Sequence, residues 1–115
     1  MKMYKILPLE KRITEVDYDG SYTAMKANIK YDWLDHCRIN SDGDMVFVND
    51  LDLLDDTYEK DGVFYIHLPS CWIMLAGEAL YWGTDYYGKN ASPHNSLEQV
   101  ENIISWTRPH SVEVQ

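Results

Sequence analysis

Turn-forming residues interrupt the sequence at short intervals and limit the length of any regular element. The clearest turn signals are Asp19-Gly20-Ser21, Ser41-Asp42-Gly43-Asp44 and Asp61-Gly62. Runs of β-branched and aromatic residues, such as residues 45–49, lie between them. Because Gly and Asp accept the backbone conformations of tight turns and β-branched residues favour strands, the pattern predicts short strands joined by hairpins. We therefore expect a mostly antiparallel sheet.

About six segments have the composition or the alternation that is typical of strands. They are residues 3–8, 12–18, 33–40, 45–49, 63–68 and 73–82. The last segment also has the Ala, Leu and Glu content of a helix. We favour a strand with a kink at Gly77, because turn residues bound the segment and Leu80-Tyr81-Trp82 favours β-structure. Neighbouring side chains of a strand point to opposite faces, so either Tyr81 or Trp82 is expected to face away from the core.

Two other segments have the spacing of apolar residues that predicts helices. Residues 22–31 follow a candidate N-cap at Ser21. Ser96 and Gln99 match a capping box, which would open a second helix that ends at Arg108-Pro109. One face of this second helix carries Leu97, Val100, Ile103 and Ile104.

The length of 115 residues is typical of one domain. We predict an α+β fold in which residues 1–109 form a single domain with a mostly antiparallel sheet of about six strands and two helices. Residues 110–115 are expected to form a loose C-terminal tail.

The charge balance argues against two classes of partner. The chain has 19 acidic and 10 basic residues, which gives a formal net charge of −9. A field of this sign repels nucleic-acid phosphates and anionic membranes. The densest basic pair is Lys11-Arg12, so we expect neither direct nucleic-acid binding nor membrane binding.

The two cysteines and the first residues point to a reducing compartment. The run from Met1 to Pro8 has an apolar stretch that is too short and too interrupted for the core of a signal peptide. Without export, Cys37 and Cys71 are expected to be free thiols. We therefore predict a cytoplasmic protein.

Acidic residues are concentrated between Asp42 and Asp61, with Lys60 as the only base. The run is not an EF-hand loop, because counting from Asp50 puts Asp55 where that loop requires Gly. Two interpretations remain, a solvated face that keeps the domain soluble and a surface that binds a basic partner. In the second, the partner-binding carboxylates are Asp50, Asp52, Asp55, Asp56 and Glu59.

The chain is rich in aromatic residues, with four Trp, nine Tyr and two Phe. Several of them gather between Trp72 and Tyr87. Tyr and Trp supply rigid contact area at protein interfaces, whereas base stacking also requires a positive groove. We predict that Trp82, Tyr86 and Tyr87 contact a partner protein or a second copy of this chain.

The residues that suggest catalysis do not form a complete constellation. Residues 83–90 satisfy the phosphate-binding pattern G-x-x-x-x-G-K, but Asn90 stands where Ser or Thr is required and Pro93 separates the loop from the next helix. His36 and Cys37 are strand neighbours on opposite faces, and His67 and Cys71 have no further zinc ligands at matched spacing. We expect no enzymatic activity, no metal and no cofactor.

Three stretches carry a resemblance to small uncharacterised proteins of tailed phages. They are residues 6–20, the run Gly43-Asp44-Met45-Val46-Phe47-Val48-Asn49-Asp50, and residues 75–85 followed by Ser92-Pro93 and a capped helix. The resemblance spans residues 4–107 and assigns no catalytic residues. It implies an accessory protein inside the infected cell, and small acidic proteins of this origin often disable host machinery.

The sequence therefore predicts one function and leaves one alternative. The first is a non-enzymatic protein whose acidic and aromatic residues bind, and inhibit, a host protein with a basic or nucleic-acid-binding surface. The alternative is an oligomeric protein that binds or sequesters a small nucleotide-like ligand, with Trp82 and Tyr86 lining the site.

Overall fold

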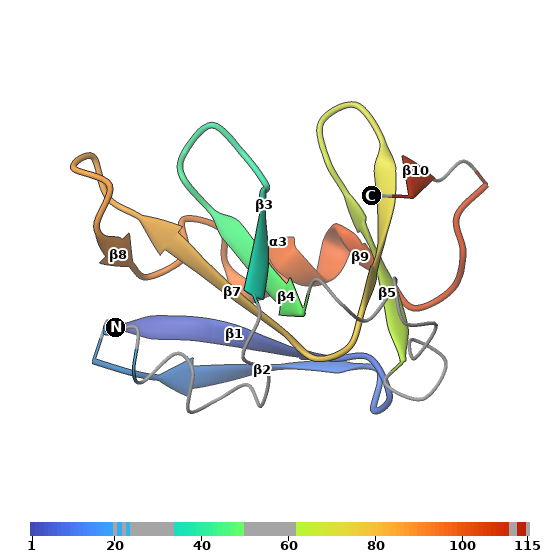
Figure 1. Ribbon diagram of the computed structural model, residues 1–115, viewed down its shortest axis with the longest axis horizontal. Coiled ribbons are helices and arrows are strands. Elements are labelled where there is room, and N and C mark those ends of the chain that lie inside the picture. The colour runs from blue at the N-terminus through green and yellow to red at the C-terminus, as the bar shows by residue number, and fades with distance from the viewer. Residues whose placement is uncertain (20, 22, 24–33, 50–61, 111–112, 115) are drawn as a thin grey trace.

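The computed structural model describes residues 1–19, 21, 23, 34–49, 62–110 and 113–114 (Figure 1). These residues form ten strands and one helix. The elements are β1 (Lys2–Leu7), β2 (Arg12–Asp17), β3 (Leu34–Arg38), β4 (Met45–Asn49), β5 (Val63–His67), β6 (Trp72–Ala76), β7 (Ala79–Thr84), β8 (Asn90–Ala91), α3 (Leu97–Asn102), β9 (Ile104–Ser105) and β10 (Glu113–Val114). The helix expected at residues 22–31 falls outside the described residues.

The strands form two sheets where we predicted one. The larger sheet has the order β2-β1-β7-β4-β3, with β8 paired to β7, and the smaller has the order β10-β6-β5-β9. All pairs are antiparallel except β10 with β6. The protein is thus a small single domain, mainly β in its described residues, and the prediction of mostly antiparallel strands is confirmed.

Residues 73–82 were expected to form one kinked strand, but they belong to two strands in different sheets. Gly77 adopts a φ of +81°, and its N–H donates to the carbonyl oxygen of Gly62 at 2.8 Å. This positive φ, which glycine adopts without steric cost, turns the chain out of β6 and into β7. β-structure in this segment was predicted, but Gly77 ends one strand and does not merely bend it.

A hydrophobic core lies between the two sheets. β1 and β7 contribute Ile6 and Tyr81 to it, β5 contributes Phe64, and α3 contributes Val100. A second buried cluster lies on the other face of the larger sheet and contains Met3, Tyr18, Leu80 and Trp82. Successive residues of β1 and β7 enter opposite clusters, so both faces of these two inner strands are buried.

The C-terminal segment differs from the prediction in two ways. The capping box is present: Gln99 N–H donates to Ser96 Oγ at 3.2 Å, and Ser96 N–H donates to Gln99 Oε1 at 2.7 Å. The helix nevertheless ends at Asn102, because Ile104–Ser105 pair with β5. Glu113–Val114 lie parallel to β6, at a position where a loose tail was expected.

Candidate functional site

The most exposed large hydrophobic side chains of the described residues are two neighbouring tyrosines. Tyr86 is 96% exposed and Tyr87 is 83% exposed. Both lie in the turn between β7 and β8, which projects at one end of the molecule (Figure 1). Their rings meet edge to face, with centroids 5.5 Å apart and planes at 90°. Burying a ring normally contributes substantially to stability, so two rings held in solvent are a candidate contact surface.

Asp85 holds this turn in a defined conformation. Its Oδ1 accepts hydrogen bonds from the N–H groups of Tyr87 and Lys89, both at 2.9 Å. The backbone adds a bond from Asp85 N–H to Lys89 O at 2.8 Å and one from Gly88 N–H to Asp85 O at 3.0 Å. The two tyrosines are therefore presented by a structured turn, which reduces the conformational entropy lost when they bind.

Trp82 does not belong to this surface, contrary to our prediction. It is only 2% exposed, and its ring stacks on Phe47 with the centroids 3.8 Å apart. Tyr81 on the opposite face of β7 is fully buried as well. We expected one of these two rings to face away from the core, but both faces of β7 are covered.

The predicted acidic surface falls outside the residues that the structure describes. This concerns Asp50, Asp52, Asp55, Asp56 and Glu59. Two acidic residues of the same run are described, and they differ sharply. Asp42 is exposed, as the solvated-face interpretation predicts, whereas Asp44 is fully buried.

Asp44 lies at the centre of a buried hydrogen-bond network. Its Oδ2 accepts from the Tyr81 hydroxyl at 2.7 Å and from the Asn95 N–H at 2.9 Å, while Oδ1 accepts from the His94 N–H at 2.7 Å. Asn95 Nδ2 donates to the Tyr81 hydroxyl at 3.1 Å, and the Tyr4 hydroxyl donates to Asn95 O at 2.9 Å. The network fastens the segment before α3 to the middle of the larger sheet.

The chemistry of this network is structural. Burial, and after it the hydrogen bond to Asp44, raises the pKa of the Tyr81 phenol far above its usual value. The phenol therefore remains a proton donor to the carboxylate, and neither group reaches solvent to act on a substrate. Sequence reasoning missed this role because nothing in the spacing distinguishes Asp44 from the acidic residues that follow it.

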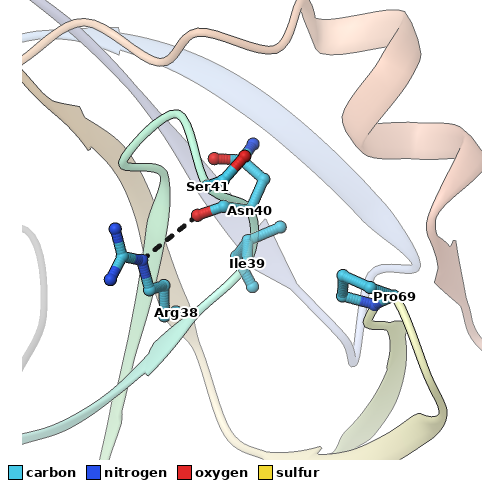
Figure 2. A pocket seen from close by; sticks show the side chains of 5 residues that line it. All are labelled: Arg38, Ile39, Asn40, Ser41 and Pro69. Carbon is cyan, nitrogen blue, oxygen red and sulfur yellow. Dashed lines mark hydrogen bonds between the residues drawn. The ribbon is translucent and has the colours of Figure 1, made fainter.

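The turn between β3 and β4 borders a shallow hollow of about 400 Å³ (Figure 2). Its lining residues are Arg38, Ile39, Asn40, Ser41 and Pro69. Asn40 Oδ1 holds the turn by accepting from the N–H groups of residues 42, 43 and 44, at 3.0 to 3.1 Å. Figure 2 shows the guanidinium of Arg38 on the side away from Pro69, with Nε donating to Asn40 O at 3.3 Å.

An adjoining hollow of about 250 Å³ shares Ile39, Asn40 and Pro69 and adds Asp42 and His67. The imidazole of His67 stacks on Trp72, with centroids 4.8 Å apart. The two hollows are continuous in their lining, with Arg38 on the first and Asp42 on the second. This mixture of charges selects no class of ligand.

A third hollow, of about 280 Å³, contains the densest basic pair of the sequence. Lys11 and Arg12 line it together with Ile13, Glu101 and Trp106. Arg12 forms an ion pair with Glu10 at 3.1 Å, and Glu101 supplies a second carboxylate. The lining of this hollow therefore carries charges of both signs, and one of its two cations is already paired.

The glycine-rich run 83–90 is a hairpin connection, as the failed phosphate-loop pattern indicates. Gly83 lies within β7, and a Cβ built on it would approach the carbonyl oxygen of Ser92 to 2.4 Å. Gly88 has a φ of +79° in the turn. The N–H groups of Tyr87 and Lys89, which a phosphate would need, are bound to Asp85. Gly83 therefore serves close packing of the chain.

Both cysteines are half-buried thiols. Cys37 and Cys71 pack against the core between the sheets, which fits a structural role. No group of three or more His, Cys, Asp or Glu that could hold a metal ion occurs among the described residues. In the same part of the chain, no helix has the length and hydrophobicity needed to cross a bilayer.

The fold and the candidate surface define a small β-rich domain that presents two tyrosines on a structured turn. Comparisons with known protein families, with curated proteins and with solved structures found no match to this chain.

Proposed function

We propose that this chain is a non-enzymatic binding protein that engages a partner protein with a positively charged surface. The observation that carries the proposal is the pair Tyr86 and Tyr87, exposed by 96% and 83% on a turn that Asp85 holds in place. Tyrosines presented rigidly in solvent have the properties of binding hot spots. The net charge of −9 favours a basic partner and speeds its association.

The proposal includes the acidic segment 50–59 on the basis of its sequence alone. Its carboxylates would provide long-range attraction, and the tyrosines would provide the desolvated contact. The resemblance to phage proteins adds a biological setting, in which the partner is a host protein that normally binds nucleic acid and is inhibited by occupation of its basic surface.

The proposal is tested by capturing partners from a bacterial extract with the immobilised chain and then measuring affinity for each purified candidate. The double variant Tyr86→Ser/Tyr87→Ser is expected to bind about 100-fold more weakly, because each ring contributes as a hot spot. The matched control is Leu9→Ser, which alters an apolar residue that is 68% exposed in another turn. Equal loss in both variants, or no loss in either, would contradict the proposal.

Neutralising the acidic segment tests separately how much its carboxylates contribute to binding of the partner. The variant with Asn at positions 50, 52, 55 and 56 raises the formal net charge by four, from −9 to −5. We expect about tenfold weaker binding at low salt and a smaller difference at high salt, where screening removes the contribution of surface charges. The measurement is the dissociation constant as a function of ionic strength.

A control with the same change of charge separates a local surface from a general effect. It neutralises four exposed carboxylates elsewhere, those of Asp17, Asp42, Glu98 and Glu101. If both variants lose affinity equally, net charge alone drives binding and segment 50–59 is not a contact surface.

A further inference from the structure

The tyrosine turn carries two exposed rings and a carboxylate, a combination that fits one particular kind of side chain. This inference rests on the proposed function, because it concerns the same surface. The rings of Tyr86 and Tyr87 are perpendicular and their centroids are 5.5 Å apart. An edge-to-face pair leaves ring faces open to solvent at right angles to each other, and the face of an aromatic ring attracts cations.

A carboxylate lies next to the two rings. Asp85 is exposed, and its Oδ1 is occupied by the N–H groups of Tyr87 and Lys89. Within the described residues, its Oδ2 has no hydrogen bond and the carboxylate has no ion pair. The residue that precedes the two exposed tyrosines thus keeps one carboxylate oxygen for a donor from outside the turn.

We propose that the tyrosine turn binds an arginine side chain of the partner protein. The planar guanidinium stacks on a tyrosine ring and donates a hydrogen bond to Asp85 Oδ2. Arginine fits better than lysine, because it can stack on a ring face and bond a carboxylate at the same time. A purely apolar partner would leave Asp85 Oδ2 desolvated without a donor, and a nucleic-acid base would bring phosphates towards a chain of net charge −9.

In the test, the full chain is titrated with capped peptides. Binding is measured from the shifts of the NMR resonances of Tyr86 and Tyr87. Three peptides of the same length carry two arginines, two lysines or two citrullines, the last having nearly the shape of arginine without its charge. The arginine peptide is expected to shift the tyrosine resonances with the highest affinity, and the citrulline peptide is expected to bind about tenfold more weakly or not at all.

Variants then assign the contacts. Tyr86→Leu/Tyr87→Leu keeps apolar groups but removes the rings and is expected to lower affinity for the arginine peptide about tenfold, whereas Tyr86→Phe/Tyr87→Phe retains it. Asp85→Asn keeps the Oδ1 acceptor that holds the turn, removes the charge, and is expected to lower affinity about threefold. All of these positions are exposed, and unfolding curves confirm that the variants are folded.

Three results would overturn the arginine inference: equal binding of the citrulline peptide, full binding by the leucine pair, or stronger shifts with a short oligothymidine. The proposed function is judged separately, on the partner protein. If the leucine pair binds the partner as the original chain does but the serine pair does not, the tyrosines act through apolar contact and only the arginine inference fails. If the serine pair also binds fully, the proposed function fails.

Discussion

Asp44→Ala is expected to lower the free energy of unfolding by about 4 kcal/mol, the largest effect of any change to a polar side chain considered for this protein. Asp44 is fully buried and accepts from three donors, Tyr81 Oη, His94 N and Asn95 N. Removing the carboxylate leaves all three without this acceptor, the Tyr81 hydroxyl in a fully buried position and the two N–H groups in partly buried ones, and each unsatisfied buried group is costly.

Two further variants are compared with Asp44→Ala by measuring the free energy of unfolding in urea. Tyr81→Phe removes one of the three donors and is expected to cost about 1–2 kcal/mol. Asp42→Ala removes an exposed carboxylate two positions before Asp44. This variant is expected to change the free energy of unfolding by less than about 0.5 kcal/mol. If Asp44→Ala proves no more destabilising than Asp42→Ala, the buried network does not hold the segment before α3 in place.

Gly83→Ala is the second substitution with a large expected effect. The added Cβ would lie 2.4 Å from the backbone oxygen of Ser92 and 3.1 Å from Asp44 Oδ1. A backbone oxygen cannot move aside as the end of a flexible side chain can, so β7 and the segment at Ser92 must separate. We expect a loss of about 3 kcal/mol in the free energy of unfolding, at the upper end for overpacking.

Gly88→Ala provides the control within the same glycine-rich run. A Cβ on Gly88 would meet no atom within 4 Å, and the cost is only that of a left-handed backbone at φ +79°. This cost is about 1 kcal/mol. Comparable losses in the two variants would show that Gly83 is not required by the close approach of Ser92.

The sequence predicted the local structure around its turns and caps. Ser41 to Asp44 form the turn between β3 and β4, and the bonds between Ser96 and Gln99 open α3. Such features depend on residues a few positions apart, whose hydrogen bonds and backbone angles are set by the residues themselves. The same reasoning predicted a connection with glycines at turn positions in place of a phosphate loop; Gly88 lies in the turn, whereas Gly83 lies within β7.

The candidate surface was predicted in part. Tyr86 and Tyr87 are exposed as expected, because they lie between two glycines in a connection. Trp82 was assigned to the same surface but is buried, because β7 is an inner strand with both faces covered. Alternation along a strand indicates which side chains share a face, but not whether that face is covered.

The sequence by itself indicated the turn at Ser41 to Asp44, the segments that form β1 to β7 and the start of α3, because these depend on interactions between near neighbours. The tertiary structure alone decided that the strands divide into two sheets at Gly77. It also decided that Asp44 is enclosed, because the three residues that donate to it lie between 37 and 51 positions further along the chain. Burial depends on which distant segments pack together. An aspartate in an acidic run is buried, rather than exposed on the surface, only when distant segments pack around it and supply hydrogen-bond donors to its carboxylate.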